Sequence, residues 1–448
     1  MADTPQDIAH ALLDAARAAG AEAADALVTS GARIDVEVRA GALEQAERAE
    51  GIDLGLRVLM GRRQACVSAS DASARTLAEM AERAVAMARE APEDPSVGLA
   101  DPGQLASDTD AAPLALASDA PEPDPAALVE RARAAEAAAL AVDGISQVDQ
   151  SGISVGRREI HLAATNGFSA GYARTDASLV CIAIAGTGTG MERDYAYESR
   201  VAYPDLPDAG EIGRLAAERT LARRSPRKPP TGAYPVLYDE RVASSLVGHL
   251  LQAVNGGSVA RGASWARDLM GTRVLPEGMD ITEDPRRPGV MGSRPFDGEG
   301  LPTARSAIVE DGVLARWVLD LGAARRLGLE STANAVRSTA APPSPSVSNV
   351  ALTQGERTRE DLMREMGTGL LVTSMIGSTI SQTTGDYSRG ASGMWIENGE
   401  PAYAVSECTV AGNLKDMLKT LVAANDARTH LSRVVPSLLV EGLTIAGE

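Results

Sequence analysis

The sequence of 448 residues contains few aromatic side chains, few cysteines and few histidines. Aromatic residues make up only 3 % of the chain while apolar residues reach 44 %, so we expect cores built mainly from Ala, Val, Leu and Ile. The length predicts two domains, or three. No run approaches the ~20 uninterrupted apolar residues of a transmembrane helix, and the N-terminus lacks the basic and apolar regions of a secretory signal.

Cysteine usage and net charge limit the cellular compartments and the kinds of partner that we expect for this protein. Cys66, Cys181 and Cys408 lie far apart and form no CxxC motif, which favours a reducing cytoplasm over secretion. We expect each thiol to be a small buried side chain rather than a nucleophile. The chain has 43 Lys and Arg against 61 Asp and Glu, a formal charge of −18. An acidic surface repels nucleic acid and anionic lipid, so we expect neither as a partner.

Recognisable catalytic motifs are also lacking. The four histidines, His10, His161, His249 and His430, include no pair at the i, i+4 spacing of a helical zinc motif. A metal site would have to be assembled from distant residues, such as His249, His430 and Cys408. No G-x-S-x-G sequence is present, and the glycine-rich stretch at 186–190 is not followed by a helical pattern, which argues against a nucleotide site.

The first half of the chain predicts an α+β domain spanning residues 1–225, with helices packed on a mostly antiparallel sheet. Ile34, Val36 and Val38 alternate with charged residues, as in a half-buried strand. Residues 91–125 are rich in Pro, Asp, Ala and Ser and predict an exposed connector. The expected helices are 4–19, 72–89, 125–142 and 209–223, and the expected strands are 26–28, 34–38, 51–59, 65–67, 153–155, 160–162, 171–172 and 179–184.

A basic, proline-rich stretch at 223–230 predicts a solvated linker. The following residues, 231–448, predict a β-rich, barrel-like domain. Asp311-Gly312 and Asn398-Gly399 lie between apolar runs, as in β-hairpins. The other expected elements are strands at 234–238, 369–376 and 437–445, a helix through 244–254 that ends at Gly256-Gly257, and helices at 359–366 and 413–424.

The segment from Ser378 to Thr384 is polar and flanked by glycines. Such an exposed strand could pair its backbone with an extended peptide. It could equally be a sheet edge kept polar against aggregation. The candidate peptide-contacting residues are Gly377, Ser378, Thr379, Ile380 and Ser381.

Five stretches of the sequence carry recognisable motifs: 46–58, 256–265, 295–300, 384–399 and 436–447. The first contains Glu47 and Gly51, and the fourth contains the Asp386-Tyr387 pair and Trp395. In this order and spacing, the five stretches resemble the TldD/TldE (PmbA) family of metallopeptidases over almost the full length.

The resemblance implies a catalytically silent subunit. TldD-type members carry His-Glu-x-x-x-His on the helix through 244–254 and a cysteine ligand near the C-terminus, whereas TldE-type members lack the metal set. Alignment through Gly256 places Val247, Gly248 and Gln252 at the motif positions, and His249 falls one place away. Residues 430–435 contain no cysteine. This chain is therefore similar to the TldE/PmbA type, with a vestigial metal-site helix and no cofactor of its own.

The resemblance further implies a heterodimer with a TldD-type partner that holds zinc. The two chains would enclose a cavity that admits unfolded or small peptides, and this chain would form part of its wall and a peptide-guiding edge. Two alternatives remain open at this point. One is a self-sufficient homodimeric peptidase with an unorthodox site that includes His249 or His430. The other is a non-enzymatic, protein-binding scaffold of the gyrase-modulator type.

Overall fold

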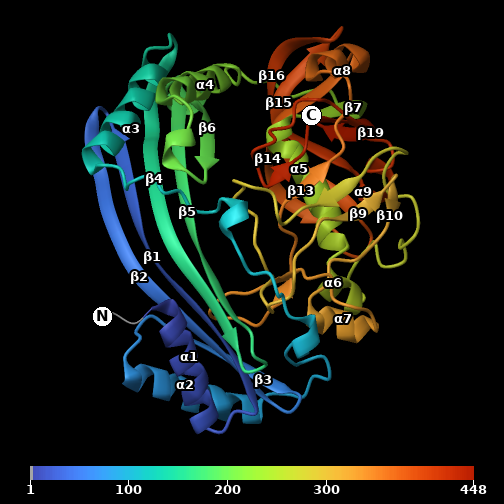
Figure 1. Ribbon diagram of the computed structural model, residues 1–448. Coiled ribbons are helices and arrows are strands. Elements are labelled where there is room, and N and C mark those ends of the chain that lie inside the picture. Colours follow the sequence, from blue (N-terminus) through green and yellow to red (C-terminus); the bar gives the residue numbers. More distant parts are fainter. Residues whose placement is uncertain (1–3, 448) are drawn as a thin grey trace.

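The first half of the chain forms one six-stranded antiparallel sheet in the order β3-β2-β1-β4-β5-β6 (Figure 1). The structure is a computed structural model and describes residues 4–447, except for the side chain of Ser378. The elements of this half are α1 (Pro5–Ala18), β1 (Ala23–Arg39), β2 (Ala42–Met60), β3 (Arg63–Ala69), α2 (Ala74–Glu90), α3 (Pro125–Leu140), β4 (Ile145–Ala164), β5 (Ser169–Ala185), β6 (Glu192–Arg200) and α4 (Ala209–Leu221).

The strands of this sheet are much longer than the expected segments. β1, β2, β4 and β5 contain 17, 19, 20 and 17 residues. The sequence pattern breaks where glycine and charged residues interrupt the apolar alternation, but strand pairing continues through these points. Gly31 pairs with Gly51, and Arg33 pairs with Gly156. Backbone pairing therefore joins the short expected strands into continuous ones.

Two helix pairs pack at opposite ends of one face of the sheet (Figure 1). Ala26 and Val28 of β1 lie in the core with α1 and α2, and Val36 and Val38 lie in the core with α3 and α4. These residues share even numbers, and side chains alternate between faces along a strand, so both helix pairs cover the same face. Leu27 points to the other face, where it packs near Phe296 of the second half.

The second half contains a closed β-barrel, as the sequence predicted. β16, β15, β14, β7 and β19 pair in succession, and a β16–β19 pairing closes the ring. The elements are β7 (Gly232–Tyr238), α5 (Glu240–Ala253), α6 (Gly256–Ala260), β8 (Ile281–Glu283), β9 (Ser306–Glu310), β10 (Val313–Leu314), α7 (Leu321–Leu327), β11 (Ala335–Val336), β12 (Ser344–Pro345), β13 (Val350–Leu352), α8 (Arg359–Met366), β14 (Gly369–Ile380), β15 (Asp386–Glu397), β16 (Glu400–Asn413), α9 (Leu414–Met417), β17 (Val422–Ala423), β18 (Arg433–Val434) and β19 (Leu438–Ala446).

Both expected hairpins are confirmed, as β9–β10 and β15–β16. The expected helix at 413–424 is wrong. Asn413 ends β16 by pairing with Asp386, and only one helical turn, α9, follows. The helical spacing of apolar residues in this segment instead reflects burial of an irregular chain, since Leu418 and Leu421 lie in the barrel core and Ala423 pairs with Leu438.

The two halves meet through buried charge and aromatic contacts. Arg337 of the second half is 1 % exposed at its side chain and pairs with Asp25 of β1, which also accepts a 2.5 Å hydrogen bond from Arg57. Phe296 packs edge-to-face on Phe168, at a ring-centroid distance of 5.0 Å. Among residues 4–447, no helix combines the length and the apolar character needed to cross a membrane.

Candidate functional site

Helix α5 is the framework of the candidate site. Asp239 caps its first turn by accepting a hydrogen bond from the backbone N–H of Arg241, and acidic side chains are favourable at a helix N-terminus. Its apolar side chains recur at helical spacing and enter the barrel core. They are Ala243, Leu246, Val247, Leu250, Leu251 and Ala253. The opposite side of α5 carries small and polar residues, and this is the side that faces a pocket.

The helix stops where the backbone must come close to a neighbouring segment. Gly256 begins α6, and its N–H donates to the carbonyl of Val318 at 2.8 Å. A Cβ atom at this position would lie 2.3 Å from a methyl group of Leu319. Glycine is therefore required sterically, and the chain turns sharply from α5 into α6 beside the pocket.

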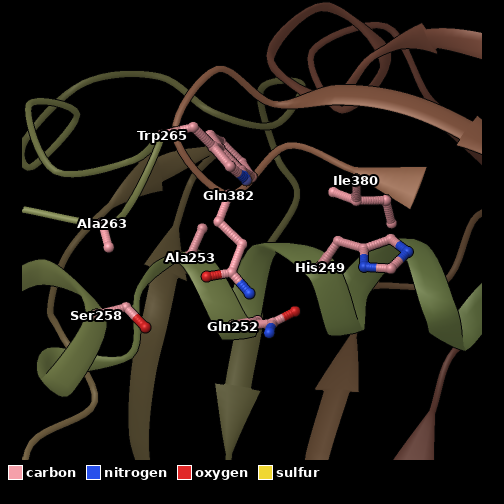
Figure 2. Close-up of a pocket in the computed structure, with 8 residues that line it drawn as sticks. All are labelled: His249, Gln252, Ala253, Ser258, Ala263, Trp265, Ile380 and Gln382. Atoms are coloured by element: carbon pink, nitrogen blue, oxygen red, sulfur yellow. The ribbon is translucent and has the colours of Figure 1, made fainter. Parts of the chain in front are cut away.

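The pocket lies between α5, α6 and the loop that follows β14 (Figure 2). His249 and Gln252 project into it from α5, Ile380 lies over His249, and Gln382 extends toward the helix from the loop above. Ala253, Ser258, Ala263 and Trp265 complete the lining. The cavity volume is about 10 Å³, far below the ~300–1,000 Å³ of most small-molecule sites. A cofactor or a folded ligand does not fit there, whereas about one water molecule does.

His249 is held as a neutral imidazole. Burial, together with the positive charge of Arg389, lowers its pKa to about 4. Its ring lies edge-on to Tyr387, with ring centroids 5.9 Å apart, and its buried Nε2 has no hydrogen-bond partner among the described residues. An unpaired buried polar atom is costly, so this nitrogen is available to a water molecule or to a group that enters the pocket.

The three motif positions suggested by the resemblance lie in different environments. The side chain of Val247 is 1 % exposed and points into the barrel core, away from the pocket. Gly248 faces open space, since an added Cβ would have no neighbour within 4 Å. Gln252 is exposed and lines the pocket with His249, one helical turn away.

The donor set does not fit zinc. Structural and catalytic zinc sites use thiolate, imidazole and carboxylate ligands, commonly three or four of them. The pocket offers one imidazole and the neutral amides of Gln252 and Gln382. Within the described residues, no group of three or more His, Cys, Asp and Glu side chains is placed to hold a metal ion.

The other two residues of the hypothetical distant metal site have separate roles. His430 Nε2 lies 3.1 Å from Glu198, a residue of β6 in the first half. Cys408 is buried in the barrel core, and its thiol donates to the carbonyl of Ala391 at 3.2 Å. Burial raises the pKa of Cys408 to about 11, so the thiolate needed for metal binding is scarce at neutral pH. His430 instead contributes to the contact between the halves.

The candidate peptide-contacting segment is the end of β14 and the turn after it. β14 pairs with β7 only at Leu370, Leu371 and Val372, and from there to Ile380 it pairs only with β15. Its other edge therefore has no strand neighbour among the described residues. Ile376 on this stretch is 77 % exposed, and Ile380 at its end lines the pocket.

The candidate residues within this segment differ in conformation. Gly377 has φ +68° at a bulge between Ile376 and Thr379, a left-handed conformation that favours glycine. Ser381 belongs to the turn, where its hydroxyl accepts from the N–H of Thr384. The side chain of Ser378 lies outside the described part of the structure.

The sequence did not indicate a histidine pair in the first half. His10 of α1 and His161 of β4 both lie within hydrogen-bonding distance of the Ser169 hydroxyl, at 2.8 and 3.0 Å, and their rings meet edge-to-face. No described carboxylate hydrogen-bonds either ring, so the group lacks the orienting acid of a hydrolytic triad. Because the two histidines are 151 positions apart, no local spacing could have revealed the pair.

Comparison with known proteins identifies relatives along the whole chain. Family models match three consecutive regions: PmbA/TldA metallopeptidase domain 1 at residues 24–88, the central domain at 118–224, and the C-terminal domain at 231–447. The metalloprotease PmbA of Escherichia coli O157:H7 is 38 % identical, over 95 % of this chain and 93 % of that protein. A metalloprotease PmbA homologue of Haemophilus influenzae is 34 % identical, over 97 % of this chain and 94 % of its own length.

Solved structures share the fold. A candidate modulator of DNA gyrase from Bacteroides thetaiotaomicron superposes with a TM-score of 0.90 and 27 % identity, covering 98 % of each chain. TldE from Thermococcus kodakarensis superposes with a TM-score of 0.84, covering 98 % of this chain and 100 % of that one. The latter is only 20 % identical and supports the fold alone.

Proposed function

Because this chain belongs to the PmbA/TldD metallopeptidase family, we propose that it is a non-catalytic, TldE/PmbA-type subunit of a heterodimeric zinc peptidase. A TldD-type partner would hold the zinc and carry out the hydrolysis of unfolded or small peptides. The observation that carries this proposal is the composition of the α5 pocket, where one neutral histidine and two amides stand in place of a zinc ligand set.

In this proposal the chain binds and orients the peptide, and it contributes no catalytic residue. The free edge of β14 offers backbone N–H and C=O groups to an extended peptide, and such pairing tolerates many sequences because it reads the main chain. The exposed side chain of Ile376 provides an apolar contact on the same edge. A peptide held there would run toward the α5 pocket, because Ile380 belongs to both. The edge thus guides substrate, and the bond is cleaved at the partner's metal.

The first test compares the chain alone with the chain mixed with a TldD-type homologue from the same organism. We expect no stoichiometric zinc and no cleavage of an unfolded peptide by this chain alone, and EDTA-sensitive cleavage on mixing. The variant His249→Ala should leave the activity of the mixture within about twofold of wild type, because the proposal gives this residue no catalytic role.

The same experiment separates the alternatives. About one zinc per chain, lost in His249→Ala, together with cleavage by the chain alone, would support a self-sufficient homodimeric peptidase. A stable complex with the TldD-type homologue that cleaves no peptide would support a non-enzymatic scaffold. Either outcome contradicts the proposal.

The edge is tested separately by site-specific photocrosslinking. A benzophenone amino acid at Ile376 should capture an unfolded peptide in the mixed complex. The same probe at Leu329, which is 51 % exposed at the end of α7, should not. Equal capture at both sites would show that β14 has no special role in guiding peptides.

A further inference from the structure

Residues 42–53 of β2 form a second strand edge with no paired strand among residues 4–447. β1 pairs with β2 along this stretch, but β3 covers only Leu54 to Met60 on the other side. Residues 42–51 and Asp53 are exposed, on both faces of the sheet, and Ile52 is half-buried. No described strand therefore lies beside this part of β2, where an extension of β3 beyond Ala69 would pair.

The register shows which backbone groups face this empty position. The carbonyl of Ala24 accepts a hydrogen bond from the N–H of Thr165, on the β4 side of β1. Backbone groups alternate in direction along a strand, so odd-numbered residues of β1 face β2. Since Gly31 pairs with Gly51, odd-numbered residues of β2 face β1 and even-numbered ones face away.

Four consecutive even-numbered residues present the free edge: Ala46, Arg48, Glu50 and Ile52. No register shift interrupts the β1–β2 pairing between Gln45 and Leu59, so the alternation holds across this stretch. The β2–β3 hairpin supports this direction. Met60 and Arg63 flank its two-residue turn and pair with each other, so the backbone groups of the even-numbered Met60 face β3, away from β1. Each of the four residues directs one N–H and one C=O outward.

An open edge of this length is unusual in a folded chain. Sheets normally protect their edges with charged side chains, proline, bulges or a covering segment, because unpaired edges recruit other strands, and of these devices this edge carries charged side chains. Residues 45–53 contain no proline and no bulge. The whole edge, residues 42–53, spans about 40 Å at ~3.3 Å per residue, long enough to receive a full strand.

The charge of the edge indicates what kind of strand it receives. Residues 42–53 contain Glu44, Glu47, Glu50 and Asp53 against Arg48, so four negative charges and one positive charge leave a net charge of −3. Arg48 is already engaged, at 2.7 Å from Glu50 and 2.6 Å from Glu122. A second copy of this acidic edge is a poor partner, in a chain whose total formal charge is −18.

We propose that the β2 edge, residues 42–53, docks an extended, net-positive strand of the non-identical partner subunit, which extends the six-stranded sheet beside β2 in line with β3. The identity of this partner as a TldD-type chain rests on the function proposed above. Main-chain hydrogen bonds to the four outward residues give affinity, and the acidic side chains select against self-pairing.

Proline substitution tests the edge directly. Ala46→Pro and Glu50→Pro each remove an outward N–H, and proline is tolerated on edge strands whose N–H faces solvent. Ala46→Val and Glu50→Gln are matched controls that keep the N–H. We expect the proline variants to bind the full-length TldD-type homologue at least tenfold more weakly by titration calorimetry, with melting temperatures close to wild type, and the controls to bind within about twofold of wild type.

A charge-reversal variant tests whether the partner strand is net-positive. Glu44→Lys with Glu47→Lys keeps every backbone group and should weaken binding severalfold, most strongly at low salt. Proline variants that bind like wild type would overturn the docking site. A wild-type chain that forms homodimers, and becomes monomeric on proline substitution, would make a second copy the occupant and overturn the heterotypic assignment. A wild-type chain that binds no TldD-type homologue, by contrast, overturns the proposed function.

Discussion

The neutral state of His249 predicts a specific dependence of stability on pH. Its pKa is lowered from 6.5 to about 4, chiefly by burial, so below pH 6.5 the unfolded chain binds a proton that the folded chain does not. The free energy of unfolding is therefore unaffected by this group above pH 6.5, and it decreases as the pH falls from 6.5 toward 4. A fall of 2.5 pKa units corresponds to ~3.4 kcal/mol at most, and partial exposure reduces this to about 1–2 kcal/mol.

The assay is urea unfolding of wild type and His249→Gln at pH 4.5 and pH 7.5. Glutamine cannot be protonated, so the variant should lose about 1–2 kcal/mol less stability than wild type between the two pH values. Gln252→Ala, in the same pocket but without a titrating group, should follow wild type. Other titrating groups are common to all three proteins and cancel in the comparison. Parallel curves for wild type and His249→Gln would refute the argument that burial keeps this imidazole neutral.

Three further predictions concern buried groups outside the pocket. Asp25→Asn should lower the free energy of unfolding by about 3 kcal/mol, because Arg337 and Arg57, both buried, lose their carboxylate partner. Arg337→Met should cost less, because Asp25 keeps its ion pair with Arg57; urea denaturation measures both. Burial and Asp297 raise the pKa of Glu299 from 4.5 to about 8, so the unfolded chain releases this proton at lower pH than the folded chain. Wild type should therefore lose stability relative to Glu299→Gln as the pH rises from 4.5 to 8, with the full difference present above pH 8, as measured by thermal melts. Val247→Ala should lower unfolding stability by about 1–3 kcal/mol by leaving a core cavity, without altering peptide cleavage in the mixed complex.

Local sequence signals predicted the longer helices, although the expected helix at 413–424 is wrong. Helix α8 matches the expected range, and Thr358 and Asp361 form a capping box at its start, a signal that depends on neighbouring residues alone. The alternation of Ile34, Val36 and Val38 likewise marked part of β1. Such signals arise from side chains within a few positions of one another, which is why the sequence carries them.

Long-range pairing could not be predicted in the same way. The barrel closes through β16–β19, where Thr409 meets Ala446, and no local pattern relates those two positions. The two-sided exposure of β2 was also invisible, since Glu47 and Arg48 look like any charged turn residues until β1 pairs with them. At the site, the sequence named His249 and Gln252, but only the fold shows that they share a pocket while Val247 points away.

The shape of the α5 pocket depends on contacts that need no metal. Asn255 caps α6 by accepting from the N–H of Gly257, and Ser264 donates to the carbonyl of Ala253, the last residue of α5. The N–H of Trp265 donates to Gln382 at 2.7 Å, which ties the loop after β14 to the corner. These hydrogen bonds and the apolar side of α5 hold the wall in place by themselves. The geometry of the pocket therefore does not depend on a bound metal ion, which is what the proposed non-catalytic, cavity-forming role requires of this chain.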